Sequence, residues 1–162
     1  SFATIPKPRL RTLDLDQFVA EFCSAFAPAW PEITLIVDQP AVPALVSADG
    51  EMLRQVLVNL TTNSALAMRE SAGTVRFATS VRGGARRSVV LEVSDSGPGI
   101  APEIRKRLFE PYTTTRSVGE GMGLGLAISR KILIDHGGDL DLVDTEAPGT
   151  TFRLMLPALE SA

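Results

Sequence analysis

The chain has few of the residues that form disulfides or bind metals. Its 162 residues include a single cysteine, Cys23, and a single histidine, His136. One cysteine excludes an internal disulfide and a cysteine metal cage, and one histidine excludes a histidine metal cluster. Cys23 lies on the apolar face of the first predicted helix, so we expect it in the core. His136 follows the last predicted helix, where a positive charge complements the helix dipole, and we expect a structural role for it.

An excess of positive charge and long apolar runs are absent as well. The chain has 16 Lys and Arg against 19 Asp and Glu, which gives a net charge of −3 at pH 7. Binding along a nucleic-acid backbone requires a basic surface, so we do not expect nucleic acid as the main partner. No apolar run reaches the roughly 18 residues of a membrane span, and we expect no signal peptide in this piece. The chain begins with Ser1, without a methionine, and we expect it to be an excised piece of a longer protein.

Hydrophobic periodicity and capping residues predict an alternation of helices and strands. Asp14 and Asp49 each precede a helical pattern, where an aspartate caps the first backbone N–H groups. We expect helices at residues 15–26, 50–70, 102–108 and 124–135, and strands at 33–38, 44–47, 74–81, 88–94, 139–144 and 150–156. The strands occur in antiparallel-looking pairs with helices between the pairs, which predicts an α+β sandwich.

The first residues differ in composition from the rest. Ser1 to Thr12 contains Pro6, Pro8 and three basic residues, which favours an extended connector. We therefore divide the chain into a connector, residues 1–13, and one folded domain, residues 14–162.

Four glycines recur at every second position of the segment GEGMGLG, at Gly119, Gly121, Gly123 and Gly125. Glycine lets a ligand approach backbone N–H groups closely, and the helix that follows adds unpaired N–H groups and the positive end of its dipole. These features predict an anion site, with phosphate as the expected anion. A glycine-rich hinge without a ligand explains the same pattern, and the segment alone does not decide between the two.

Asn59 and Asn63 lie four residues apart and share one face of the second predicted helix. Asparagine is a poor helix-interior residue, and its amide oxygen is a hard neutral ligand that suits Mg²⁺ together with water and phosphate oxygens. Asp95 ends an apolar strand and precedes Gly97 and Gly99, where its carboxylate would accept a hydrogen bond from the exocyclic amine of adenine. A solvated polar edge for the asparagines and a loop-capping turn for the aspartate remain open alternatives.

Residues 110–120 are polar, rich in threonine and without periodicity, which predicts a mobile loop. Phe109, just before this loop, is expected to anchor a lid. Arg116, within it, would pair with a phosphate through its planar guanidinium group. An exposed arginine on a flexible loop is the common alternative.

Five motifs occur in one order and with spacings that resemble the ATP-binding catalytic domain of bacterial sensor histidine kinases. They are the pair Asn59–Asn63 and the segments DSGPGI, FEPYTTTR, GMGLGLAI and GTTF. This domain belongs to the wider ATPase family of gyrase, the Hsp90 chaperone and MutL. The resemblance runs from about Asp14 to Pro157, and FEPYTTTR with the lead-in SFATIPKP looks most like the nitrogen-regulation class of sensor kinases. It implies a Bergerat-type two-layer α/β sandwich, with a mixed, mostly antiparallel sheet packed on helices and a mobile ATP lid.

The resemblance also implies a site for ATP and Mg²⁺. Asn63 would bind Mg²⁺ with Asn59 beside it, and Asp95 would hold the adenine amine. Arg116 would join the two asparagines in catalysis. The residues expected to contact ATP are Asn59, Asn63, Ala67, Asp95, Gly97, Gly99, Ile100, Phe109, Tyr112, Thr114, Thr115, Arg116, Gly121, Met122, Gly123, Leu124, Gly125, Leu126 and Thr150.

Two positions depart from the pattern that the resemblance leads us to expect. Leu66 stands where many members carry a lysine or arginine, so the positive charge for the phosphates is expected from Arg116 or, second, from Arg69. Thr61 stands where an aliphatic residue is usual, which we expect to loosen packing without removing the metal site.

Asn59 stands where gyrase-like members carry a glutamate that activates water, and an asparagine cannot accept that proton. The resemblance therefore implies transfer of the γ-phosphoryl group of Mg·ATP to a histidine, in place of fast hydrolysis. The expected partners are a preceding dimerisation and histidine phosphotransfer domain, joined through residues 1–13, and a response regulator.

We expect this piece to be monomeric and cytoplasmic, and the whole kinase to be a homodimer anchored in the bacterial inner membrane. Two alternatives remain open: a gyrase- or Hsp90-like ATPase, and a degenerate, non-catalytic nucleotide-binding or docking module.

Overall fold

The computed structural model describes residues 5–69, 71–110, 125–145 and 148–159. Its α-helices are α1 (Leu15–Phe26), α2 (Gly50–Ala67), α3 (Pro102–Arg105) and α4 (Gly125–Asp135), with a 3₁₀ turn, η2, at Ala27–Ala29. Its strands are β1 (Arg11–Asp14), β2 (Ile33–Asp38), β3 (Leu45–Ala48), β4 (Gly73–Arg82), β5 (Ser88–Asp95), β6 (Asp139–Leu142) and β7 (Thr150–Pro157). No helix in these ranges is both long enough and apolar enough to cross a bilayer.

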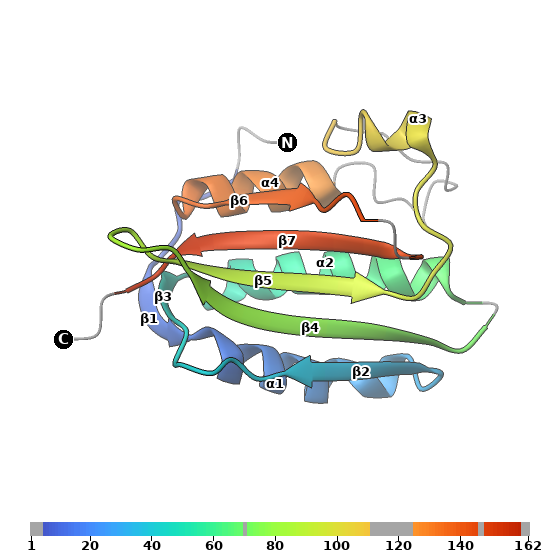
Figure 1. Cartoon of the computed structure of the whole chain (residues 1–162), viewed down its shortest axis with the longest axis horizontal. Coiled ribbons are helices and arrows are strands. Elements are labelled where there is room, and N and C mark those ends of the chain that lie inside the picture. The colour runs from blue at the N-terminus through green and yellow to red at the C-terminus, as the bar shows by residue number, and fades with distance from the viewer. Residues whose placement is uncertain (1–4, 70, 111–124, 146–147, 160–162) are drawn as a thin grey trace.

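The main sheet has five strands in the order β2-β4-β5-β7-β6, and β1 and β3 form a separate two-stranded sheet. The pair β2–β4 is parallel and the other pairs of the main sheet are antiparallel. Helices α1, α2 and α4 lie on one face of this sheet, as Figure 1 shows. The expected α+β sandwich with a mixed, mostly antiparallel sheet is therefore confirmed.

Three local predictions differ from the structure. Strand β1 occupies Arg11–Asp14, within and just beyond the segment that we expected to be only a connector. Strands β2 and β3 do not form a pair, because β2 joins β4 and β3 joins β1. Helix α2 ends at Ala67 and α3 at Arg105, both three residues earlier than expected.

The two predicted helix caps are confirmed. The side chain of Asp14 accepts a hydrogen bond from the Gln17 N–H at 3.2 Å, and that of Asp49 accepts one from the Met52 N–H at 3.1 Å. Each aspartate satisfies one of the N–H groups that the first turn of a helix leaves without an intrahelical partner.

His136 connects the end of α4 to the start of α2. Its Nε2 accepts a hydrogen bond from the Asp49 N–H at 3.0 Å, and its Nδ1 lies 2.7 Å from the carbonyl oxygen of Ile132. An acceptor at Nε2 requires the neutral imidazole with its proton on Nδ1, which then donates to Ile132. The structural role is confirmed, because both ring nitrogens of His136 make hydrogen-bond contacts within the fold.

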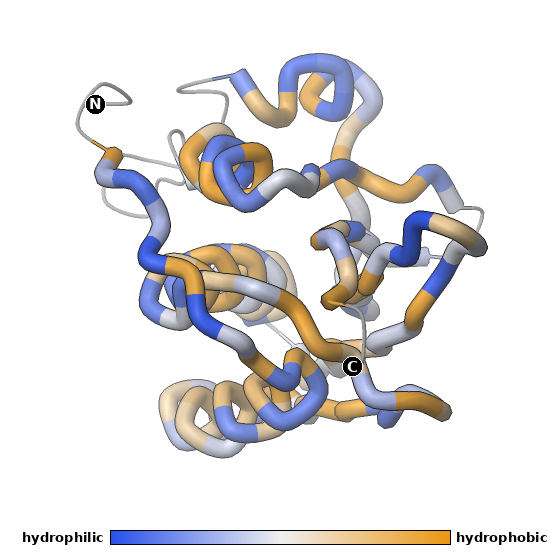
Figure 2. Tube along the Cα trace, turned by 90° about the vertical axis from the view of Figure 1, so that its left-hand side faces the viewer, coloured by the Kyte–Doolittle hydropathy of each residue, from blue (hydrophilic) through white to orange (hydrophobic). Residues whose placement is uncertain are grey.

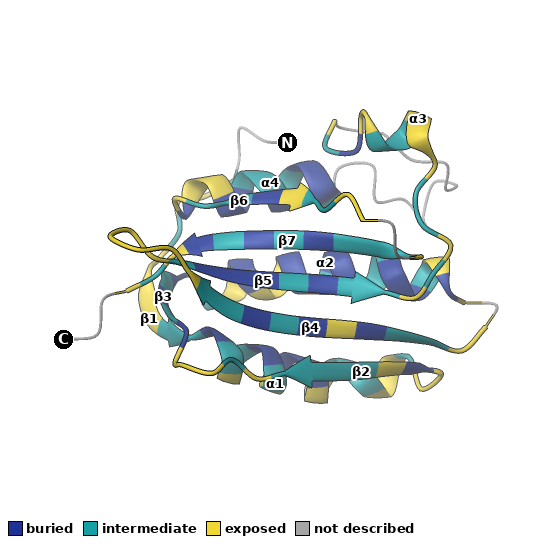
Figure 3. Ribbon diagram, viewed as in Figure 1, coloured by how far each residue is buried: buried dark blue, intermediate teal, exposed yellow. Residues whose placement is uncertain are grey.

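The core lies between the helices and the inner face of the sheet. Figure 3 shows buried positions alternating with more exposed ones along β4, β5 and β7, as expected when one sheet face is covered. In Figure 2 the helices alternate hydrophobic and hydrophilic colours around each turn, which is the pattern of amphipathic helices. Cys23 is buried in this core, as expected.

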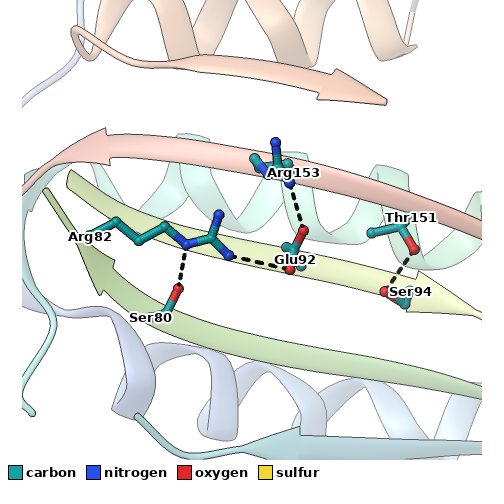
Figure 4. Close-up of polar contacts among 6 residues, drawn as sticks. All are labelled: Ser80, Arg82, Glu92, Ser94, Thr151 and Arg153. Atoms are coloured by element: carbon teal, nitrogen blue, oxygen red, sulfur yellow. Dashed lines mark hydrogen bonds and ion pairs between the residues drawn. The ribbon is translucent and has the colours of Figure 1, made fainter. Parts of the chain in front are cut away.

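The outer face of the sheet carries a group of polar contacts between strands, which Figure 4 shows. Glu92 on β5 pairs with Arg153 on β7 at 3.2 Å and with Arg82 on β4 at 3.6 Å. Beside them the hydroxyl of Thr151 donates to that of Ser94 at 2.9 Å. These cross-strand contacts connect the neighbouring strands β4, β5 and β7 on the face opposite α1, α2 and α4.

Candidate functional site

Asp95 is the last residue of β5, and its carboxylate connects three segments of the chain. Its Oδ2 accepts a hydrogen bond from the Ser64 hydroxyl on α2 at 2.7 Å. Its Oδ1 accepts one from the Gly97 N–H at 2.9 Å and another from the Thr150 N–H at 3.2 Å. The antiparallel register of β5 and β7 places Thr150 directly opposite Asp95, which explains the last contact.

The glycines around Asp95 allow this close packing. A Cβ on Gly149 would lie 1.9 Å from the Asp95 carbonyl oxygen, and one on Gly97 would lie 3.1 Å from Asp95 Oδ1. Gly99 has φ +85°, in the region that favours glycine. Side chains at these positions would displace the carboxylate or the backbone beside it.

Helix α2 carries the two predicted asparagines. Asn59 is buried, and its Nδ2 donates to the Ser129 hydroxyl on α4 at 3.2 Å. A Cβ on Gly125, the first residue of α4, would lie 2.4 Å from Asn59 Oδ1. Asn63 is half-buried and immediately precedes Ser64, the residue that holds Asp95. One helix therefore connects the start of α4 with the end of β5.

A surface hollow of about 570 Å³ lies beside this group. Its lining comes from the end of α2 and from the segment after β5, and comprises Leu66, Ala67, Met68, Arg69, Ser71, Ser96, Gly97 and Pro98. Two residues of the expected ATP site, Ala67 and Gly97, are among them. Ile100 and Thr150 line a second, much smaller pocket together with Gly149.

Phe109 packs against the body of the domain. Its ring meets that of Phe152 edge-on at 6.5 Å, and the Arg130 guanidinium lies 5.2 Å from its centre. Arg130 also pairs with Asp139 at 2.9 Å. The hydrogen bond from Arg130 lowers the pKa of Asp139, and the same bond raises the pKa of Arg130. The residue expected to anchor a lid is thus held between β7 and α4.

Of the remaining residues that we expected to contact ATP, one lies in the hydrophobic core and eight lie outside the described part of the chain. Leu126 is buried in the hydrophobic core. Eight further predicted residues lie outside the described ranges: Tyr112, Thr114, Thr115, Arg116, Gly121, Met122, Gly123 and Leu124. The expected loop 110–120 also lies there, except for Glu110. Among the described residues, no group of three or more His, Cys, Asp or Glu could hold a metal ion.

Two residues of this site were missed by reasoning from the sequence. Ser64 and Ser129 both sit on buried helix faces, where a serine side chain requires a hydrogen-bond partner. That requirement indicates that each serine has a polar partner, but it does not identify the partner. Ser64 binds Asp95, 31 residues away in the sequence, and Ser129 binds Asn59, 70 residues away. Only the fold shows which polar groups meet.

Comparison with known proteins gives a consistent result. Residues 48–160 match the family described as histidine kinase-, DNA gyrase B-, and HSP90-like ATPase. The nitrogen regulation protein NtrY of Azorhizobium caulinodans is 36% identical over 98% of this chain and 21% of its own length. The C4-dicarboxylate transport sensor protein DctS of Rhodobacter capsulatus is 39% identical over 93% of this chain and 23% of its own length. The chain therefore spans less than a quarter of each of these relatives.

Solved structures agree with the sequence matches. The nucleotide-free catalytic domain of the histidine kinase ThkA superposes with a TM-score of 0.77 and 27% identity, over 93% of this chain and 96% of that one. Full-length ShkA in complex with AMPPNP superposes with a TM-score of 0.78 and 28% identity, over 99% of this chain and 35% of that one.

Proposed function

Because the chain belongs to the family of histidine kinase-, DNA gyrase B- and HSP90-like ATPases and is homologous to sensor histidine kinases, we propose that it binds Mg·ATP and transfers the γ-phosphoryl group to a histidine. The acceptor would lie on a separate dimerisation domain, and a response-regulator aspartate would receive the phosphoryl group next.

The observation that carries this proposal is the environment of Asp95. Its carboxylate is fixed by donors from α2, from its own loop and from β7, and it remains half-exposed beside two glycines. An ionised carboxylate accepts hydrogen bonds but donates none, so it suits the 6-amino group of adenine. Gly97 and Gly99 leave room for the base to approach the backbone.

Asn63 fits the role of Mg²⁺ ligand, one turn beyond Asn59 on α2. Its amide oxygen is a hard neutral ligand, and Mg²⁺ takes its remaining positions from water and phosphate oxygens. When bound, the ion neutralises the charge that develops on the transferring phosphoryl group. Because Leu66 supplies no charge, Arg116 is the first candidate for a cationic contact to the phosphates and Arg69 the second.

Asn59 supports transfer over hydrolysis. Its amide is bound to Ser129 and packed against Gly125, and an amide cannot act as the general base that activates water. The alternative functions remain a gyrase- or Hsp90-like ATPase and a degenerate docking module.

The wider assembly is also part of the proposal. Residues 1–13 would connect this domain, residues 14–162, to the preceding dimerisation and phosphotransfer domain of a homodimer. A response regulator is the expected partner, as in the solved complex of ThkA with TrrA. We propose that the parent protein is a kinase of the nitrogen-regulation class anchored in the inner membrane. This domain would lie on its cytoplasmic side.

Calorimetric titration of this chain with ATP, with Mg²⁺ and with EDTA, tests the site. We expect Asn63→Ala to weaken binding of Mg·ATP about tenfold, equivalent to about 1.4 kcal/mol, and to change binding of metal-free ATP little. Gln55→Ala, which removes an exposed amide from the same helix, is the matched control and should bind as the wild type does. Absence of ATP binding, or rapid hydrolysis that Asn63→Ala leaves unchanged, would contradict the proposal.

A further inference from the structure

Ser64 is the buried residue that holds Asp95 from the helix side. It is 4% exposed, and its hydroxyl donates to Asp95 Oδ2 at 2.7 Å, a short bond of the kind formed with a charged acceptor. It directly follows Asn63, so the residue proposed to bind the metal and the residue that fixes the carboxylate are neighbours on α2.

The hydrogen bonds around Asp95 leave little accepting capacity. A carboxylate offers about four lone-pair sites, two on each oxygen. The N–H groups of Gly97 and Thr150 both bind Oδ1, and Ser64 takes one site on Oδ2. Among the described residues these are the donors to Asp95, and they leave one lone pair, on Oδ2, for a donor from a ligand.

We propose that Ser64 is a positioning residue for nucleobase selection: it orients Asp95 so that a single acceptor faces the base and receives the 6-amino group of adenine. This inference rests on the proposed nucleotide-binding function. Guanine carries an acceptor at position 6, and its N1–H and 2-amino groups pair with a carboxylate only when both oxygens are free. Gly97 and Thr150 occupy Oδ1, so that two-point pairing is not available to guanine.

The hydroxyl of Ser64 has a second effect on selection. Because its proton is committed to Asp95, Ser64 Oγ presents only acceptor lone pairs to its surroundings. Both groups at this end of the site therefore accept hydrogen bonds. A nucleobase that places a hydrogen-bond donor here is therefore favoured. A nucleobase that places a carbonyl oxygen here is disfavoured, because its lone pairs repel those of Asp95 and Ser64.

The experiment compares binding of ATP with binding of purine riboside triphosphate, which lacks only the 6-amino group. We expect wild type to prefer ATP, and Ser64→Ala to lose about tenfold in ATP affinity while affinity for the amine-free analogue stays within twofold. A purely structural role for Ser64 would lower both affinities together. Ser64→Thr, which keeps the hydroxyl, should restore the preference for ATP.

Thr61→Val is the matched control, because it removes another buried hydroxyl from the same helix, one that forms no hydrogen bond to Asp95 or to any other described residue. It should keep the wild-type preference. An unchanged preference in Ser64→Ala, or equal wild-type affinity for the two nucleotides, would overturn the positioning role while leaving ATP binding intact. Failure of the wild type to bind either nucleotide would instead overturn the proposed function.

Discussion

At the scale of single residues, Thr61 is a buried polar group without compensation. Its side chain is fully buried, and its Oγ1 has no hydrogen-bond partner among the described residues. A buried hydroxyl without a partner costs about 1–3 kcal/mol of stability. The threonine that departs from the expected aliphatic pattern is therefore accommodated at a cost to the stability of the fold.

We predict that Thr61→Val stabilises the protein by about 1 kcal/mol, or about 2–4 °C in Tm, because valine keeps the shape and removes the unpaired hydroxyl. Thermal unfolding followed by circular dichroism measures this shift. Thr12→Val, at an exposed position of β1, serves as control and should leave Tm unchanged. A lower Tm for Thr61→Val would mean that the hydroxyl has a partner after all.

Cys23 should be chemically inert in the folded protein. Burial raises the pKa of its thiol to about 11, so at pH 8 only about a thousandth of it is the reactive thiolate. Labelling with a thiol reagent at pH 8 should be slow in buffer and immediate in denaturant. The raised pKa also means that stability is fully present below about pH 8.5 and falls as pH rises toward 11. Fast labelling of the native protein would contradict this burial.

At the scale of elements, the turn after α4 depends on close contact with β7. A Cβ on Gly138 would lie 1.7 Å from the carbonyl oxygen of Met155, a backbone atom that cannot move without disturbing the sheet. The N–H groups of Gly137 and Gly138 bond back to carbonyls of α4 at 2.9 Å, which closes the helix as predicted.

Gly138→Ala is therefore expected to cost about 2–4 kcal/mol, measured as the change in the free energy of unfolding in urea. Gly84→Ala is the matched control, because a Cβ there meets nothing within 4 Å, and it should change stability by less than about 0.5 kcal/mol. Equal effects of the two substitutions would contradict the packing of the α4–β6 turn against β7.

The elements that could be predicted from the sequence are those set by local chemistry. Helices α1 and α2 begin where Asp14 and Asp49 cap them, and the hairpin β4–β5 surrounds its glycine turn. Strand β1 was missed because it has four residues next to a proline-rich segment and forms only by pairing with β3, more than 30 residues later. The parallel pairing of β2 with β4 likewise depends on the whole fold.

The site shows the same difference between contacts that are local in the sequence and contacts that depend on the whole fold. The contact between Asp95 and Gly97 could be predicted, because the two residues lie two positions apart at one strand end. The roles expected for Asp95, Gly97 and Asn63 in binding ATP and Mg²⁺ stay predictions. The bonds from Ser64 to Asp95 and from Asn59 to Ser129 could not be predicted, because each joins two elements whose approach depends on the packing of the entire sandwich.

At the scale of the whole molecule, α2 is the element that organises the site. It carries Asn63, the proposed Mg²⁺ ligand, it holds Asp95 through Ser64, and it contacts α4 through Asn59. A ligand that contacts both Asp95 and the start of α4 would therefore bridge the sheet and the helices that cover it.

The most direct measurement is transfer of label from γ-³²P-ATP to a polypeptide that joins this domain to the dimerisation domain proposed to precede it. Phosphoryl transfer to histidine predicts a label on that domain that is labile in acid and stable in alkali, requires Mg²⁺, and is lost in Asn63→Ala. Release of inorganic phosphate without protein label, or an acid-stable label on serine or threonine, would contradict a histidine kinase.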